Sequence, residues 1–170
     1  FEKYPDYVFN FTGSRRYNMM KEYYPELFKK VQDYVKAGRW YVSGSSVDEG
    51  EVNITSSESL IRQILYGNEY FQKEFGKESY DYMLPDCFGF LCNLPTVFHY
   101  CGLLGFSTQK LTWHSAVGVP FNVGVWNGPD GKGVIAALNA TDYGGRVEPR
   151  LDSDQSWIKR LDTDKAKTGY

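Results

Sequence analysis

Short β-like segments and amphipathic helical segments alternate along the first two-thirds of this 170-residue chain. Two parallel strands need a connection of about a dozen residues or more, usually a helix, so the alternation predicts parallel strands with helices packed on them. The predicted fold class is therefore α/β, with the strands in either an open sheet or a sector of a barrel. The expected strands are 7–11, 39–43, a segment that runs into Asp86, and 103–108, and the expected helices are 25–38, 55–76 and 95–102.

The longest expected helix, 55–76, has the clearest start and stop signals. Thr55-Ser56-Ser57-Glu58 has the pattern of a capping box, and Gly76 is a typical helix-ending residue. The periodicity predicts a buried helix face made of Ile61, Ile64, Leu65, Phe71 and Phe75.

The pattern changes after residue 108. Segments 123–126 and 133–137 flank the turn-rich sequence Asn127-Gly128-Pro129-Asp130-Gly131, which predicts a β-hairpin instead of another strand and helix. The apolar positions within 153–167 predict a last helix.

Composition and charge exclude several classes of protein. With 42% hydrophobic and 17% aromatic residues, the chain has the composition of a globular domain with a core. A net charge of −2, with basic residues scattered among acids, does not favour a nucleic-acid partner. No apolar run approaches the roughly 18 residues of a membrane span, and the first residues lack a signal-peptide pattern. We therefore expect a soluble chain without a membrane partner. Its oligomeric state and its compartment stay open, and a secreted or periplasmic parent protein is one of the options.

Carboxylates follow two neighbouring expected strands. Asp48, Glu49 and Glu51 come after 39–43, and Asp86 ends an aromatic-rich run between a proline and a glycine turn. In parallel α/β folds ligands bind beyond the carboxyl ends of the strands. Two carboxylates across such a cleft are typical of glycoside hydrolysis, one as nucleophile or base and one as proton donor. Asp86 is the predicted catalytic residue, whereas a solvated acidic loop is the simpler interpretation of Glu49 and Glu51.

Few other residues could take part in chemistry. His99 and His114 are not at ligand spacing from each other or from Asp86, so the spacing predicts no complete metal shell. Lys110, next to Gln109 at the end of the fourth expected strand, is a cation that would hold Asp86 ionised. The three cysteines are interpreted as thiols packed around the site, and they are Cys87, Cys92 and Cys101.

Six motifs spread along most of the chain are specific when taken together. They are Gly38-Arg39-Trp40; Glu49, Glu51 and Asn53; Glu58-Ser59-Leu60-Ile61-Arg62-Gln63; Leu84-Pro85-Asp86-Cys87-Phe88-Gly89; Thr108-Gln109-Lys110 with Trp113; and Trp126 with Gly128-Pro129-Asp130-Gly131. With these motifs the chain closely resembles the catalytic domain of glycoside hydrolase family 38, the retaining, zinc-dependent alpha-mannosidases.

The resemblance implies both a fold and a reaction. It implies a sector of a seven-stranded parallel (β/α) barrel-like domain of the glycoside hydrolase and deacetylase type. Asp86 would be the nucleophile and also a ligand of one Zn²⁺, forming a covalent mannosyl-Asp intermediate during hydrolysis of alpha-mannosidic bonds. The partner molecule would be a mannose-containing oligosaccharide or glycan. The implied substrate-binding residues are Glu51, Phe88, Gln109, Lys110 and Trp113.

Some elements of the resembled family are not identifiable in residues 1–170. An HxD motif that supplies two zinc ligands is expected before Phe1, and a further histidine ligand and the acid/base aspartate are expected after Tyr170. Asp142 is the one stand-in for the proton donor within the chain. The chain is accordingly interpreted as a partial alpha-mannosidase catalytic domain that is inactive when isolated.

Two alternative functions stay open at this point. In the first, the chain is a non-catalytic carbohydrate-binding module whose Trp40, Trp113 and Trp126 rings stack on sugars. In the second, the carboxylate and metal serve a deacetylase-like domain that removes an N-acetyl group.

Overall fold

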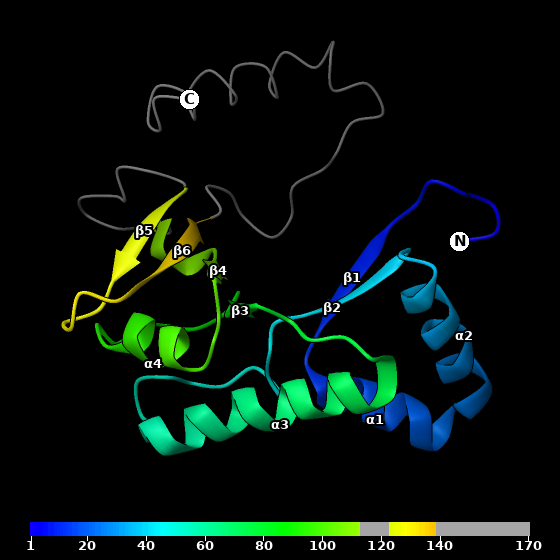
Figure 1. Ribbon diagram of the computed structural model, residues 1–170, viewed down its shortest axis with the longest axis horizontal. Helices are drawn as coiled ribbons and strands as arrows, with labels where there is room; N and C mark the ends of the chain where they lie inside the picture. The colour runs from blue at the N-terminus through cyan, green and yellow to red at the C-terminus, as the bar shows by residue number, and fades with distance from the viewer. Residues whose placement is uncertain (113–122, 139–170) are drawn as a thin grey trace, which may run out of the picture.

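Two β-sheets with helices packed against them make up the described part of the chain (Figure 1). The computed structural model describes residues 1–112 and 123–138. The predicted α/β class is confirmed. In chain order the elements are β1 (Phe9–Thr12), α1 (Ser14–Tyr23), α2 (Pro25–Lys36), β2 (Trp40–Ser43), α3 (Ser57–Phe75), β3 (Asp81–Met83), α4 (Leu94–Tyr100), β4 (Gly105–Thr108), the 3₁₀-helix η1 (Lys110–Thr112), β5 (Val123–Asn127) and β6 (Gly133–Leu138).

The strand order is β1-β2 in one sheet and β3-β4-β6-β5 in the other. Neighbouring strands are parallel except β5 and β6, which form an antiparallel hairpin. The predicted hairpin is thus confirmed, and β6 pairs in parallel with β4. The expected helix 153–167 lies outside the described residues. Because β3, β4 and β6 run in the same direction, their carboxyl ends meet at one edge of the sheet.

The segment after β2 joins the two sheets. Gly44 donates its N–H to Asp81 Oδ1 at 3.3 Å, and Ser45 Oγ donates to the Ser79 carbonyl at 2.7 Å. Within residues 1–112 and 123–138, no backbone ladder joins β2 to β3. The strands described are therefore two adjoining sheets and not a closed barrel.

Two helices connect β1 to β2, where the sequence predicted one helix starting near Pro25. The first, α1, buries Ser14 and Tyr17 and has a weak amphipathic pattern, which is why the periodicity did not reveal it. The chain breaks at Tyr24 (φ −138°, ψ 59°) because the ring of a proline disfavours helical backbone in the residue before it. The second helix, α2, begins at Pro25 as predicted.

The start of α3 differs from the predicted capping box. The N-cap is Ser56, whose Oγ accepts a hydrogen bond from the Ser59 N–H at 3.2 Å. Glu58 instead pairs with Arg62 one turn later, at 2.7 Å. Gly76 ends the helix in the left-handed conformation, as predicted. None of the helices described is both long and apolar enough to cross a bilayer.

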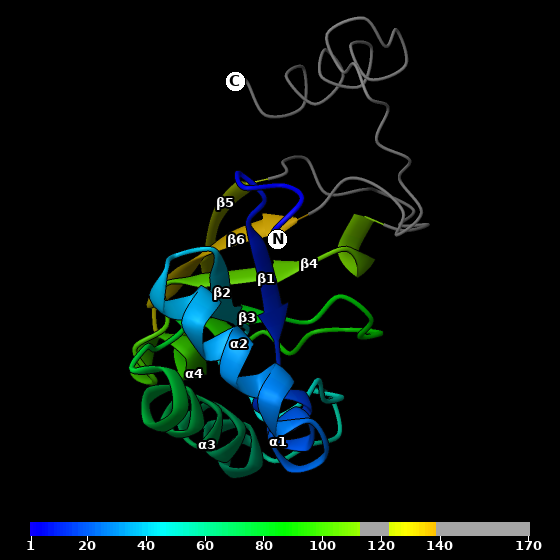
Figure 2. The same ribbon diagram turned by 90° about the vertical axis from the view of Figure 1, so that its right-hand side faces the viewer.

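Helix α3 contributes to both hydrophobic cores of the described chain, and Figures 1 and 2 show it below the strands together with α1 and α4. Ile64 packs in the core of the four-stranded sheet, and Phe71 packs in the core made with α1, α2 and β2. Leu65 was predicted to be buried but is 55% exposed. It lies about 100° around the helix from Ile64 and so falls outside the buried stripe, which is Leu60, Ile64, Gly67 and Phe71.

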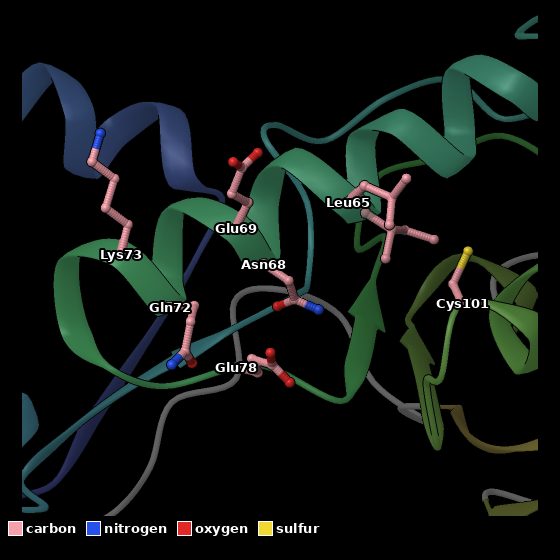
Figure 3. Close-up of a pocket in the computed structure, with 8 residues that line it drawn as sticks. Leu65, Asn68, Glu69, Gln72, Lys73, Glu78 and Cys101 are labelled. Atoms are coloured by element: carbon pink, nitrogen blue, oxygen red, sulfur yellow. The ribbon is translucent and has the colours of Figure 1, made fainter.

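A surface pocket of about 580 Å³ lies beside the outer part of α3 (Figure 3). Leu65 from the helix, Glu78 before β3 and Cys101 after α4 are among its lining residues. Glu78 and Cys101 come just before the amino ends of β3 and β4, so the pocket lies at the edge of the sheet opposite to Asp86. Cys101 is therefore remote from Asp86, and the expectation that it packs around the predicted site is wrong.

Asn68 of α3 satisfies the backbone of the buried residue Ser79. Its Nδ2 donates to the Ser79 carbonyl and its Oδ1 accepts from the Ser79 N–H, both at 3.0 Å. The carbonyl also accepts from Ser45 Oγ, whereas the N–H donates to Asn68 Oδ1. We expect Asn68→Ala to lower the free energy of unfolding by about 2 kcal/mol, because a buried N–H loses its partner.

Urea denaturation of the protein, expressed with its native flanking sequence, measures this effect. Asn68→Asp keeps an acceptor for the Ser79 N–H and should recover part of the loss. Equal destabilisation by Ala and Asp would contradict the assignment of the effect to that hydrogen bond.

Candidate active site

Asp86 lies in a turn just beyond the carboxyl end of β3. The strand ends at Met83, earlier than the sequence predicted, although the Leu84 N–H still donates to the Ser107 carbonyl of β4 at 3.0 Å. The Asp86 side chain is 57% exposed. A carboxylate is thus accessible at the sheet edge where α/β proteins bind their ligands.

Lys110 faces this carboxylate from the start of the 3₁₀-helix η1, which follows the neighbouring strand β4. Its Nζ lies 2.7 Å from Asp86 Oδ1, and the Lys110 side chain is only 10% exposed. Thr108, which is buried, holds the two strand ends together, since its Oγ1 donates to the Leu84 carbonyl at 2.7 Å and accepts from the Lys110 N–H at 3.2 Å. The ammonium group is therefore held in a fixed position beside the carboxylate.

Phe88 forms an apolar surface next to the ion pair. Its side chain is 77% exposed, and the Lys110 Nζ lies 4.9 Å from the centre of its ring. Such an arrangement is a cation–π contact. The structure thus brings Asp86, Phe88 and Lys110 together at one edge, as a carboxylate, a cation and an open aromatic ring.

The loop that carries Asp86 rests on residues that follow β2. The Glu49 side-chain Oε1 accepts a hydrogen bond from the Asp86 backbone N–H at 2.9 Å. Cys87 Sγ donates to the Gly50 carbonyl at 3.0 Å. The sequence analysis interpreted Glu49 as a surface acid, and no local pattern pairs it with a residue 37 positions away.

Cys87 is the cysteine that lies at this site, whereas Cys92 is exposed and Cys101 lies at the opposite edge. Burial, with a smaller contribution from the nearby Glu49 and Glu51 carboxylates, raises the pKa of the Cys87 thiol from 9.0 to about 11. The thiol is therefore protonated at neutral pH and acts as the donor to Gly50.

We expect Cys87 to resist alkylation by iodoacetamide near neutral pH, while Cys92 reacts. The thiolate is the reactive form, and the raised pKa disfavours it. The same shift makes a stability contribution that is complete below pH 9.0 and is lost as the pH rises through about 11. Peptide mapping by mass spectrometry measures the labelling, with urea-unfolded protein as the control. Equal rates for Cys87 and Cys92 in the folded protein would contradict the prediction.

Two of the remaining predicted substrate-binding residues, Glu51 and Gln109, also belong to the described part of the chain. The Glu51 carboxylate accepts a hydrogen bond from the Asn53 N–H at 2.9 Å, which stabilises its own loop. Gln109 precedes Lys110, and its side-chain oxygen is buried. Trp113, the third, lies outside the described residues. Lys110 and Phe88 make the contacts described at the Asp86 carboxylate and its neighbouring ring, whereas the Glu51 contact lies within its own loop.

The tryptophans that the structure describes are packing residues. Trp40 is half-buried, and its Nε1 donates to the Tyr17 hydroxyl at 2.8 Å. Trp126 packs against the core, with its ring centre 5.2 Å from that of Phe106. Neither ring is an open platform for a sugar. His99 is exposed on α4, and His114 and Asp142 lie outside the described residues.

The described residues do not by themselves fit a complete zinc site. A catalytic zinc commonly takes three protein ligands. Within residues 1–112 and 123–138, no group of three His, Cys, Asp or Glu side chains is arranged to hold an ion. Of these residues, Asp86 has an exposed carboxylate of the kind that can ligate zinc.

The chain is similar in sequence and in fold to known alpha-mannosidases. The chain is 37% identical to alpha-mannosidase G of Dictyostelium discoideum over 82% of its own length, and 34% identical to human alpha-mannosidase 2C1 over 88%. It spans only 13% and 15% of those two proteins. An alpha-mannosidase from Enterococcus faecalis V583 has the same fold, with a TM-score of 0.77 at 22% identity over 98% of this chain and 19% of that one.

The fold extends to another solved structure. A 4-alpha-glucanotransferase from Thermococcus litoralis superimposes with a TM-score of 0.65 at 14% identity, over 81% of this chain and 22% of that one. Residues 1–166 match the model of the N-terminal domain of glycosyl hydrolases family 38. The chain therefore belongs to glycosyl hydrolases family 38.

Proposed function

We propose that this chain is part of the catalytic domain of a retaining alpha-mannosidase, with Asp86 as its nucleophile. One observation carries the proposal: an exposed Asp86 carboxylate is paired with Lys110 at 2.7 Å, beside the open Phe88 ring, at the ligand-binding edge of a family 38 fold. The names of the relatives, alpha-mannosidases from Dictyostelium discoideum, human and yeast, support mannose as the sugar.

The reaction would proceed in two displacements at the anomeric carbon. In the first, an Asp86 oxygen bonds to carbon one of mannose, the bond from that carbon to the aglycone oxygen breaks, and the aglycone oxygen takes a proton from an acid outside the described residues. In the second, water attacks carbon one, its proton is taken up by that group, and Asp86 leaves as a carboxylate. Mannose is then released with its original anomeric configuration.

Lys110 and Phe88 would have distinct roles in these steps. The Lys110 ammonium keeps Asp86 ionised before attack. It is also placed to stabilise the negative charge that returns to Asp86 in the second displacement, since its Nζ contacts Oδ1 directly. The exposed Phe88 ring would pack against the apolar face of the sugar.

The cofactor, the complete barrel and the partner are further parts of this proposal. One Zn²⁺ would bind Asp86 together with ligands outside the described residues, and the two sheets would belong to a seven-stranded barrel-like domain. A mannose-containing glycan would be the substrate. We expect the protein with its native flanking sequence to lose activity on chelation and to regain it with added zinc, whereas residues 1–170 alone should be inactive. Activity that persists after complete metal removal would contradict the zinc assignment.

The central test is stereochemical. The protein with its native flanking sequence is incubated with aryl alpha-mannoside, aryl beta-mannoside and aryl alpha-glucoside, and the first-formed sugar is observed by proton NMR. We expect hydrolysis of the alpha-mannoside with alpha-mannose as the first product. Initial formation of beta-mannose would exclude a covalent Asp86 intermediate, and preference for the glucoside would exclude mannose as the natural sugar.

A further inference from the structure

Several contacts join the loop 86–89 to the segment 49–53. Glu49 Oε1 accepts from the Asp86 N–H at 2.9 Å, and Cys87 Sγ donates to the Gly50 carbonyl at 3.0 Å. At the other end of the loop, Gly89 packs so closely on Asn53 that a Cβ added there would lie 2.6 Å from Asn53 Nδ2. The residues after β2 thus form a support for the loop that carries the candidate nucleophile.

The Glu49 contact is the one made to Asp86 itself, and it is made to main chain. A hydrogen bond with a charged acceptor is stronger than one between neutral groups. It holds the backbone from which the Asp86 side chain projects, while Lys110 holds the carboxylate end of that side chain. Both contacts restrain the direction of the carboxylate. A displacement of the attacking oxygen by about 1 Å is enough to slow such a reaction strongly.

We propose that Glu49 is a positioning residue, which orients the Asp86 nucleophile through a hydrogen bond to its backbone N–H. This inference rests on the proposed function for its kinetic consequences. It differs from both earlier interpretations of Glu49, as a solvated surface acid and as a second catalytic carboxylate. A positioning role needs only an acceptor oxygen at the Glu49 Oε1 position, whereas acid/base catalysis needs an ionisable group.

Glu49→Gln and Glu49→Ala separate these roles. Glutamine keeps an acceptor oxygen of the same reach, so we expect kcat within about twofold of the wild type and an unchanged pH profile. Alanine removes the acceptor, so we expect kcat to fall about tenfold with little change in KM, the size of effect expected when one hydrogen bond to a charged group is lost. Glu26→Ala, which removes an exposed carboxylate at the start of α2, is the matched control and should leave kcat unchanged.

Each other outcome overturns the proposal. Wild-type kcat in Glu49→Ala would mean that Glu49 is a surface acid after all. A loss in Glu49→Gln as large as that in Glu49→Ala, with one limb of the pH profile missing, would mean that Glu49 is an acid/base catalyst.

Amide hydrogen exchange provides a measurement that does not depend on activity. We expect Glu49→Ala to accelerate exchange of the Asp86 N–H at least tenfold, with Glu49→Gln and Glu26→Ala close to the wild type. If the wild type hydrolyses no mannoside, the proposed function fails, and the exchange rate alone then decides whether Glu49 holds Asp86. Unchanged exchange in Glu49→Ala would overturn the positioning role whatever the activity.

Discussion

Asp86→Asn is expected to lower kcat on an aryl alpha-mannoside by about 10⁴-fold or more, because a neutral amide oxygen replaces the attacking carboxylate. Stability should fall as well. The Asp86 side chain is 57% exposed, but the Lys110 side chain is only 10% exposed, so the change removes the counter-charge from a largely buried ammonium group. Steady-state kinetics and a thermal unfolding curve, both on the protein with its native flanking sequence, measure the two effects.

A second variant tests the chemical role of Asp86 more directly. Asp86→Ala leaves room for an external anion, so added azide should restore activity and yield the beta-mannosyl azide, because azide attacks from the face that Asp86 occupied. Asp33→Asn, at an exposed position of α2, is the matched control and should keep full activity. Substantial turnover by Asp86→Asn, confirmed by mass to be free of reverted Asp, would remove Asp86 as the nucleophile.

Gly67→Ala is expected to lower the free energy of unfolding by about 3 kcal/mol. A Cβ at this position would lie 2.5 to 2.8 Å from the backbone N, Cα and C atoms of Ser46. Two effects oppose each other here, because alanine in a helix is favoured over glycine by about 1 kcal/mol. Overlap with main-chain atoms is the larger effect, since backbone cannot rotate away as the end of a side chain can. Denaturant unfolding measures the result.

The same change should reach the active site. Ser46 lies in the segment that leads from β2 to Glu49, so movement away from α3 would shift the support of the Asp86 loop. We therefore expect a lower kcat as well as lower stability. Gly50→Ala is the matched control for stability, because a Cβ at Gly50 meets nothing within 4 Å. Unchanged stability in Gly67→Ala would show that α3 and this segment are not in tight contact.

Much of the fold follows from local patterns in the sequence. The alternation of apolar runs and helical periodicity predicted the parallel strands, and Pro25, Gly76 and the turn at 127–131 marked element boundaries correctly. Helix α1 was not predicted, because its amphipathic pattern is weak. Leu65 was placed on the wrong face, because a one-residue error in phase is about 100° of rotation.

The part of the candidate site that local sequence patterns predict best is the single carboxylate Asp86. A carboxylate just beyond a parallel strand singled out Asp86, and the sequence motifs around it indicated the family. The neighbours of Asp86 were less predictable. The tryptophans suggested as sugar platforms include Trp40 and Trp126, which pack against other rings instead.

By itself, then, the sequence determined the α/β class, the family and the acidic residue at the strand end, because each depends on patterns that are local along the chain. Only the tertiary structure decided which groups surround that residue. Glu49 reaches Asp86 across 37 positions, and Lys110 reaches it from the 3₁₀-helix that follows β4. Such pairings depend on how strands lie side by side, which is set by packing between distant segments and has no local sequence pattern.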